Sequence, residues 1–394
     1  MKVLVANLGS TSFKYRLFDM DTEEQLAQGG VERIGAAESA CETRTARGQT
    51  SSTLPVPNHS VAVQWCLEQL THPETGCVSS VAEISAIGFK AVHGGLKSGV
   101  FLVDEALLQE MQRVAIVAPA HNPPYIRAMR QLAESCGPLP LVAAFETDFH
   151  RTIPRPRKIY GIPKAWTDDL GVQRWGFHGA SHRYIAGRIA QLMGRNDLKV
   201  ISCHLGGSSS LCASDHGRSV GTTMGMSPQT GLPQNNRVGD FDAFAIPLLM
   251  EQTGKSLEEV LAILSSQGGL LGISGVSGDM RDLRQAAATG NADAQLALDF
   301  FAAEVRRLMG GLVIELGPPD AIVFTGGIGQ NDWQLRQEIT QGLDWLGVRL
   351  SESLNPQVRT EGRIDDGQGC QIWVVPTNEE LVVARQVKAL LESP

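Results

Sequence analysis

Apolar and polar residues follow one another over the first twenty positions in a pattern that predicts two β-strands. Residues 2–6 form a mostly apolar run, Asn7–Ser12 is a polar turn, and Phe13, Tyr15 and Leu17 then alternate with polar residues. An apolar run, a turn and a period of two are typical of strands joined by a short connection.

The same pattern recurs near the middle of the chain. The stretch KVISCHLGGSSS at 199–210 repeats the order of KVLVANLGSTSF at 2–13, with a constant offset of 197 residues. In a glycine-rich chain, chance could place a Leu-Gly turn twice, but both copies also carry an apolar strand before the turn. We infer that one supersecondary unit was duplicated to build two similar domains.

Helical periodicity appears in several other stretches, at residues 104–114, 124–135, 257–264, 294–312 and 379–391. An apolar run at 321–324 leads through the glycine turn 325–329 into a helix-like stretch at 333–343. Strands that alternate with helices predict an α/β fold. Residues 36–60 are polar and turn-rich, and we interpret them as a surface loop without chemical content.

Length and charge limit the classes of protein to consider. A chain of 394 residues is long enough for two domains of about 150–200 residues each. A hydrophobic fraction of 42% and a charged fraction of 19% predict a folded globular protein. The net charge of −8 and the lack of clustered Lys and Arg argue against a broad nucleic-acid surface, so any phosphate ligand would be held locally.

The seven cysteines are scattered and never form a C-x-x-C pair, which predicts reduced thiols and a cytoplasmic location. The N-terminus lacks a basic region followed by a long apolar stretch, and no window contains 18 consecutive apolar residues. Neither export nor membrane spanning is therefore expected.

Loops that follow predicted strands carry residues suited to phosphate chemistry. Phosphoryl transfer rests on a metal ion that bridges phosphate oxygens, on cations that neutralise the transferring charge, and on backbone amides that position it. The glycine turn 325–329 could bind an anion or a nucleotide at the start of a helix, although a purely structural turn is about as common. Further candidate loops lie at 90–95, 145–150, 175–182, 237–240 and 376–380.

Seven short stretches, in this order and spacing, resemble the acetate kinase family, a branch of the sugar kinase, Hsp70 and actin superfamily. They are NLGSTSFKY at 7–15, AVHGG at 91–95, AHNPP at 120–124, GFHGASH at 176–182, GISGVSGDMRD at 272–282, FTGGIG at 324–329 and PTNEEL at 376–381. The resemblance covers nearly the whole chain, and it agrees with the internal repeat.

The resemblance implies an α/β fold of two duplicated ribonuclease-H-like domains, of the actin-like ATPase type, around a central cleft. Residues 1–147 with a returning helix at 381–394 would form the acid and phosphate side, and residues 148–380 would bind the nucleotide and form a homodimer. It also implies that the carboxylate of a short acid attacks the γ-phosphorus of ATP, with Mg²⁺ or Mn²⁺ as the cofactor. Acetate is the first choice for the acid. The products would be an acyl phosphate and ADP.

Residue by residue, the resemblance implies that Asn7 and Glu379 lie at the metal ion and that Ser10, Ser12 and Lys14 form a first phosphate hairpin. A single carboxylate with amide and phosphate oxygens suits Mg²⁺, which retains water. Taken alone, Glu379 is more simply explained as an acidic residue that stabilises a helix N-terminus through the helix dipole.

The implied catalytic residues are Arg237, His178, Glu146 and Lys90. Arg237 would face the transferring phosphoryl group, where its planar fork can hold two oxygens, and His178 would donate to the same group. Taken alone, an Arg is more often a solvated surface residue, and a His among apolar neighbours is more often structural.

The implied nucleotide site is spread over several loops. Its members are Ser10, Ser12, Lys14, His204, Leu205, Gly206, Gly207, Ser208, Asp279, Met280, Arg281, Gly327, Ile328, Gly329, Gln330 and Asn331. The acid pocket would be lined by Lys90, Val92, Ala120, Phe177 and Pro228, a small and mostly apolar set that suits a methyl-bearing acid.

Several positions depart from the family's usual residues. Lys90 stands in place of Arg, Glu146 in place of Asp, Gly207 in place of Asn, Gln330 in place of Glu, and Asn236 in place of Thr.

These departures and the pocket leave three hypotheses open. The first is an acetate kinase. The second is a kinase for propionate, butyrate or a substituted acid, since Ala120 stands where the family often has Leu and leaves room for an acid with a longer acyl chain. The third, from another class, is a nucleotide-binding homologue with little turnover.

Overall fold

The computed structural model describes residues 1–9, 11–119, 121–135, 137 and 139–393. The chain divides into two units, and each is described by itself. Unit 1 comprises Met1–Asp148 and Asn378–Pro394, and unit 2 comprises Phe149–Thr377. The second boundary follows Thr377 rather than residue 380, so Glu379 and Glu380 belong to unit 1.

Unit 1 is built on a mixed sheet with the strand order β5-β4-β3-β2-β1-β6-β8-β7. Strand β1 pairs antiparallel with β2 and parallel with β6, and β6 pairs parallel with β8. The strands are β1 (Lys2–Leu8), β2 (Ser12–Asp19), β3 (Glu24–Glu32), β4 (Ser39–Thr45), β5 (Gly48–Leu54), β6 (Ile84–Ala91), β7 (Val100–Leu102) and β8 (Leu141–Phe145).

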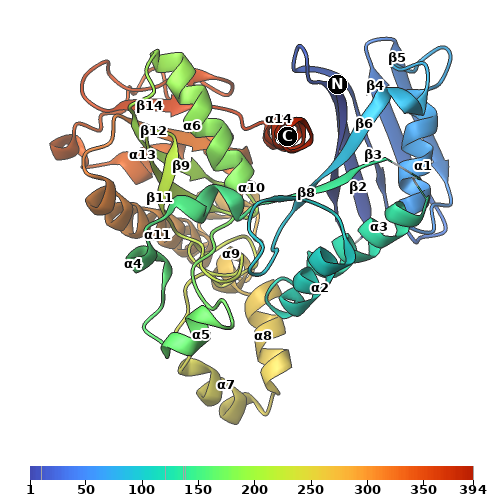
Figure 1. Cartoon of the computed structure of the whole chain (residues 1–394). Helices are drawn as coiled ribbons and strands as arrows, with labels where there is room; N and C mark the ends of the chain where they lie inside the picture. The colour runs from blue at the N-terminus through green and yellow to red at the C-terminus, as the bar shows by residue number, and fades with distance from the viewer. Residues whose placement is uncertain (10, 120, 136, 138, 394) are drawn as a thin grey trace. The chain divides into compact units, whose positions relative to one another are not determined.

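Helices cover both faces of this sheet (Figure 1). Alternate strand residues such as Leu4, Phe13 and Phe89 point into the main core, which they share with α1 (His59–Leu70), α2 (Glu105–Arg113) and α3 (Asn122–Ser135). Helix α14 (Glu379–Glu392) packs on the opposite face. It approaches so closely at Gly88 that an added Cβ would lie 2.6 Å from Val387, which explains the glycine there.

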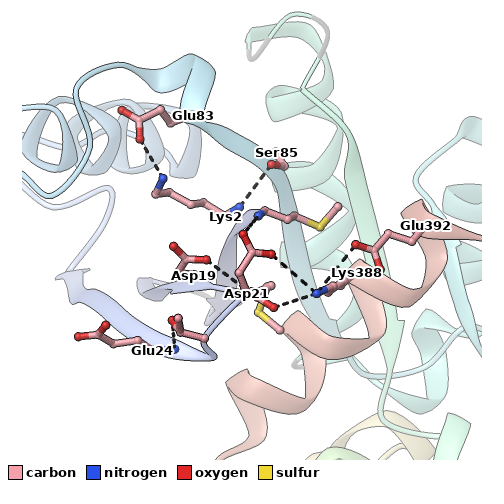
Figure 2. Close-up of polar contacts among 11 residues, drawn as sticks. Lys2, Asp19, Asp21, Glu24, Glu83, Ser85, Lys388 and Glu392 are labelled. Carbon is pink, nitrogen blue, oxygen red and sulfur yellow. Dashed lines mark hydrogen bonds and ion pairs between the residues drawn. The ribbon is translucent and has the colours of Figure 1, made fainter.

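Polar contacts tie α14 to the start of the chain (Figure 2). The Lys388 ammonium donates to the Met20 carbonyl at 2.9 Å, and it lies 4.0 Å from Asp21. Asp21 in turn accepts from the N-terminal ammonium at 3.1 Å. These contacts hold the C-terminal helix, and therefore Glu379 at its first turn, against the β1–β2 hairpin.

Unit 2 contains a second mixed sheet, with the order β11-β10-β9-β12-β14-β13. Its strands are β9 (Lys199–His204), β10 (Ser210–Asp215), β11 (Arg218–Thr222), β12 (Ala321–Thr325), β13 (Gly362–Arg363) and β14 (Gln371–Val374).

The two faces of the second sheet have separate cores. One face packs against α10 (Met280–Ala288), α11 (Ala292–Leu316) and α13 (Trp333–Thr340), and the other packs against α6 (Gly179–Met193). Shorter helices complete the unit: α4 (Arg155–Lys158), α5 (Lys164–Asp168), α7 (Ala245–Thr253), α8 (Leu257–Ser266), α9 (Gly269–Ser274) and α12 (Gly326–Asn331). No helix in the described ranges has the length and apolar character needed to cross a bilayer.

The predicted duplication is confirmed by the strand topology. The order β3-β2-β1-β6-β8 in unit 1 matches β11-β10-β9-β12-β14 in unit 2, and the corresponding pairs run in the same sense. The two similar stretches at 2–13 and 199–210 begin the first hairpin of each sheet. The helices predicted from periodicity are also present as α2, α3, α8, α11, α13 and α14.

The interpretation of residues 36–60 as a loop was wrong. Strands β4 and β5 form an antiparallel hairpin there, and α1 begins at His59. In β4 the buried positions alternate with exposed ones, but two of those buried residues are Ser39 and Thr43, so an apolar scan misses the period of two. Thr43 is satisfied by a hydrogen bond with the Tyr15 hydroxyl at 2.5 Å.

Candidate active site

In unit 1 a largely buried charged group forms where strands β6 and β8 end and helix α14 begins. The Lys90 ammonium lies 2.5 Å from the Glu379 carboxylate, and the two side chains are only 20% and 12% exposed. Burial lowers the pKa of Lys90, but the charges of Glu379 and of the buried Glu146 raise it by more, so the net shift is upward. Lys90 is therefore a cation that is paired with Glu379 and further stabilised by the charge of Glu146.

Asn7, at the end of β1, is oriented by Tyr125 of α3. The Tyr125 hydroxyl donates to Asn7 Oδ1 at 3.1 Å and accepts from the backbone N–H of Leu8 at 3.1 Å. Burial raises the pKa of Tyr125 to about 12, which keeps its proton in place as a donor. One lone pair of Asn7 Oδ1 remains for a further partner.

These residues fit a magnesium ion by the chemistry of their donor atoms. Asn7 and Glu379 offer oxygen atoms, which Mg²⁺ prefers. In the described part of the chain, no group of three or more His, Cys, Asp and Glu could enclose an ion. Phosphate oxygens and water would therefore have to complete the coordination.

The first predicted phosphate hairpin is only partly described. The turn is closed by a hydrogen bond from the Gly9 N–H to the Ser12 carbonyl at 2.8 Å. Lys14 projects from β2 with 67% of its side chain exposed, 3.5 Å from Glu32. Ser10 lies outside the described residues.

In unit 2 a chain of histidines and serines leads to His178. His182 Nδ1 lies 2.7 Å from Ser202 Oγ, its Nε2 lies 2.9 Å from Ser210 Oγ, and Ser210 Oγ lies 2.8 Å from His178 Nδ1. The Ser202 hydroxyl donates to the Cys212 carbonyl at 3.4 Å, so Ser202 accepts from His182 Nδ1.

The direction of this chain fixes the tautomer of His178. A neutral His182 with a proton on Nδ1 accepts at Nε2, so Ser210 donates to it and must accept from His178 Nδ1. Neutral His178 therefore carries its proton on Nδ1, and only the imidazolium form can donate from Nε2. His204 stacks on His178 with ring centroids 4.3 Å apart, which disfavours a positive charge on both rings at once.

The backbone at His178 is strained. Its φ of 55° and ψ of 28° lie in the left-handed region, which non-glycine residues seldom adopt. The preceding carbonyl, that of Phe177, accepts from His150 Nε2 at 2.9 Å, and the buried His150 also contacts Ser219 at 2.9 Å. His150 thus holds the turn that presents His178 at the start of α6.

His150 predicts a dependence of stability on pH. Burial lowers its pKa to about 4, whereas an unfolded His titrates near 6.5. Because the unfolded state binds the proton more readily, stability is lost as the pH falls from about 7 towards 4. Between pH 7 and pH 5 we expect this residue to lower the free energy of unfolding by about 2 kcal/mol.

Denaturant unfolding at pH 7 and pH 5 checks this expectation. The variant His150→Gln keeps a donor for the Phe177 carbonyl but does not titrate. Its free energy of unfolding should therefore fall by about 2 kcal/mol less than that of the wild type between pH 7 and pH 5. An equal pH dependence in the variant and the wild type would contradict the role given to His150.

Arg237 lies on a turn next to the loop that follows β9. Its guanidinium donates to Gln234 Oε1 at 3.1 Å and lies 3.5 Å from Ser208 Oγ. Burial lowers its pKa, and no carboxylate of the described residues lies within ion-pair distance. A partly buried cation without a counter-ion is suited to an anionic ligand.

A cavity of about 790 Å³ opens in unit 2 beside the glycine-rich loop that follows β9. Its lining includes the predicted nucleotide residues Gly206, Gly207, Asp279, Met280, Arg281, Gly327, Ile328 and Asn331. The volume is within the range of small-molecule sites. His204, Leu205, Ser208, Gly329 and Gln330 are not in this lining, and Ser12 and Lys14 belong to unit 1.

Two contacts shape the walls of the cavity. Asp279 caps α10 and pairs with Arg281 at 2.6 Å, and the hydrogen bonds from Arg281 lower the pKa of the Asp279 carboxyl. At the third glycine loop, the N–H groups of Ile328 and Gly329 donate to the Leu205 carbonyl at 2.9 and 3.1 Å. These amides tie two loops together instead of facing the cavity.

Arg336, from α13, secures the end of α12. It is fully buried, and its guanidinium donates to the carbonyls of Gly329 and Gln330 at 2.8 and 2.7 Å. Its other contacts are with Asn355 and the Val358 carbonyl. All five N–H groups of the guanidinium therefore have acceptors, and α12 is anchored to the rest of unit 2.

The residues predicted to line the acid pocket come from both units. Lys90 and the half-buried Val92 belong to unit 1, whereas Phe177 and Pro228 are buried in unit 2. The Pro228 carbonyl accepts from Gln234 Nε2 at 2.8 Å, which links it to the turn that carries Arg237. Ala120 lies outside the described residues.

The sequence did not reveal several residues that shape these sites. Asn235, Arg284, Asp332 and Gln334 also line the cavity. Arg284 pairs with Asp332 at 3.2 Å and with Glu338 at 2.7 Å, and its partners lie far along the chain. Asn235 could have been suspected, because it stands two positions before Arg237.

The two duplicated sheets are those of the actin-like ATPase fold, and a cavity large enough for a small molecule lies beside the glycine-rich loop that Arg237 approaches. Comparisons with known proteins identify the family of the chain. Residues 2–385 match the model of the acetokinase family. The acetate kinase of Heliobacterium modesticaldum is 43% identical over 397 residues, which cover 100% of both chains.

Solved structures agree with this assignment. The crystal structure of Porphyromonas gingivalis acetate kinase has a TM-score of 0.90 at 31% identity, and covers 99% of this chain and 100% of its own. A propionate kinase from Francisella tularensis has a TM-score of 0.89 at 32% identity, with 98% of each chain covered. The chain belongs to the acetokinase family, whose members are phosphotransferases with a carboxyl group as acceptor.

Proposed function

We propose that this protein transfers the γ-phosphoryl group of ATP to acetate and, in reverse, makes ATP from ADP and acetyl phosphate. The structural observation that carries the proposal is Arg237, a partly buried cation without a carboxylate partner among the described residues, next to Ser208 and the glycine loop of the cavity. The full-length relationship to acetate kinases supports acetate as the acceptor.

In the proposed reaction an acetate oxygen forms a bond to the γ-phosphorus while the bond from that phosphorus to the β,γ-bridging oxygen breaks. Arg237 balances negative charge on the transferring group with its planar fork. His178 donates from Nε2 as the imidazolium, since its neutral form keeps the proton on Nδ1. Lys90, paired with Glu379 and stabilised by the charge of Glu146, supplies positive charge for the carboxylate of the acid.

Asn7 and Glu379 are the residues that would hold Mg²⁺, because both offer oxygen ligands and both are fixed by neighbours, Tyr125 and Lys90. The bound ion supplies charge neutralisation on the phosphate oxygens. Glu146 remains in the proposal as a second carboxylate, whose charge stabilises the Lys90 ammonium.

We also propose a homodimer formed through unit 2. Large apolar side chains are exposed on three of its helices and on the segment before α7. They are Phe241, Phe244, Leu248, Leu257, Leu261, Leu296, Phe300 and Ile314. Burial of such side chains against a second copy is a common source of dimer stability. Free thiols at the six described cysteines agree with a cytoplasmic location.

An acyl phosphate trap tests the proposed activity. The purified protein is incubated with ATP, Mg²⁺ and hydroxylamine, together with formate, acetate, propionate, butyrate or a substituted acid, and the hydroxamate is measured. We expect the highest kcat/KM with acetate. If no hydroxamate forms with any of these acids, the kinase proposal is wrong. The protein is then a nucleotide-binding homologue without turnover.

A second candidate substrate, propionate or butyrate, rests on Ala120, which stands where the family frequently has Leu. We expect Ala120→Leu to shift selectivity towards acetate by about tenfold, because an overpacked contact with a longer acyl chain costs about 1–3 kcal/mol. The measurement is kcat/KM for the three acids in both proteins. If the ratios among the acids stay constant, Ala120 lies outside the pocket.

A further inference from the structure

The turn that carries Arg237 is rigid. It is closed by a hydrogen bond from the Gln234 N–H to the Arg237 carbonyl at 3.0 Å. The carbonyls of Gln234, Asn235 and Asn236 accept from N–H groups at the start of α9 at 2.9, 2.9 and 3.0 Å. Since these N–H groups have no partner within the helix, the turn caps α9 and is fixed by it.

Asn235 points its side chain at the glycine loop from this turn. A Cβ placed on Gly207 would lie 3.5 Å from Asn235 Nδ2, so the amide occupies the space beside the missing side chain. The backbone N–H of Asn235 also donates to the Gly207 carbonyl at 3.4 Å. Asn235 and Gly207 both line the cavity.

The Asn235 amide has no protein partner among the residues that the structure describes. Its Oδ1 is buried without a hydrogen bond, whereas Nδ2, which makes no hydrogen bond to a described residue, is not among the buried atoms. Buried polar groups in folded proteins nearly always find partners, and the exceptions call for an explanation. Here packing on a rigid turn, rather than hydrogen bonding, sets the position of an amide at the wall of a ligand cavity.

We propose that the Asn235 amide binds the phosphate chain of the nucleotide, with Nδ2 as the donor to a phosphate oxygen. Gly207 has no side-chain amide, and Asn235 supplies one from a neighbouring turn. This donor stands two residues before Arg237 in the sequence. The inference rests on the proposed function only in taking the cavity as the nucleotide site. A hydrogen bond to a charged oxygen is stronger than one between neutral groups, so its loss is measurable.

Direct binding tests the inference without any need for turnover. The dissociation constants of ADP and of adenosine are measured by calorimetry for the wild type and for Asn235→Ala. We expect ADP to bind about tenfold more weakly to the variant or worse, and adenosine to bind equally well. Equal ADP affinity, or an equal loss for ADP and adenosine, would overturn the assignment to the phosphate chain.

Three further variants separate this role from a structural one. Asn235→Asp has nearly the same shape but loses the donor and adds negative charge, so it should bind ADP more weakly than Asn235→Ala. Asn236→Ala, on the exposed neighbour, should bind like the wild type. Gly207→Asn combined with Asn235→Ala should recover most of the lost affinity, because the φ of Gly207 is not positive and a side chain fits there.

The outcomes also distinguish the inference from the proposed function. If ADP binding depends on Asn235 but no acyl phosphate forms, the kinase activity fails while the inference stands. If acyl phosphate forms and Asn235→Ala binds ADP like the wild type, the inference alone fails.

Discussion

Replacement of Arg237 by Ala is expected to lower kcat by at least about a hundredfold, with little change in the affinity for ADP. The guanidinium has no counter-ion among the described residues, so its charge is available to the transferring phosphoryl group. Negative charge moves across that group during transfer, and a preorganised cation there acts mostly in the transition state. A hundredfold loss corresponds to about 2.7 kcal/mol of transition-state stabilisation.

The matched variant for this test is Arg237→Lys, which keeps the charge but cannot hold two oxygens at once. Its kcat should lie between those of the wild type and the Ala variant. The measurement is kcat at saturating ATP, acetate and Mg²⁺, with thermal unfolding to confirm that the variants are folded. If Arg237→Ala keeps more than about a tenth of the wild-type kcat, Arg237 does not contact the transferring group.

Replacement of Glu379 by Ala should have the second largest effect, a sharp rise in the Mg²⁺ concentration needed for activity, by about tenfold or more. In the proposed metal site, this carboxylate would supply both charge and an oxygen ligand to the ion. The variant should also be less stable, because the ion pair with the largely buried Lys90 is broken. Glu379→Gln keeps the shape and separates the loss of charge from the loss of packing.

Glu380→Ala is the internal control for this variant. Glu380 is the next residue of α14, but it lies 3.6 Å from Arg16 rather than at Lys90. Magnesium titrations at fixed ATP should therefore match the wild type for Glu380→Ala. A titration of Glu379→Ala that also overlays the wild type would remove Glu379 from the metal site.

The fold could largely be predicted from the sequence because its signals are local. The repeated strand, Leu-Gly turn and strand at 2–13 and 199–210 mark the first hairpin of each sheet. Apolar periodicity similarly marks α11 and α14. The β4–β5 hairpin was missed because two of its three buried positions, Ser39 and Thr43, are small polar residues. Their burial depends on distant partners, such as Tyr15 of β2 for Thr43, that a local pattern does not contain.

The candidate site was less predictable, because its geometry depends on contacts between distant segments. The sequence singled out Arg237 and Glu379 through family resemblance. It gave no sign that Lys90 pairs with Glu379, or that Ser210 joins His178 to His182. Such contacts depend on how strands and helices pack, and no spacing along the chain encodes them.

The most direct test of the central claim follows the oxygen that attacks phosphorus. Acetate labelled with ¹⁸O in its carboxylate is incubated with the protein, ATP and Mg²⁺, and the acetyl phosphate formed is examined by ³¹P NMR. If the carboxylate attacks the γ-phosphorus of ATP, the phosphorus of the product carries one ¹⁸O and its resonance shows the isotope shift. An acetyl phosphate signal without that shift, or no acetyl phosphate at all, would contradict the account.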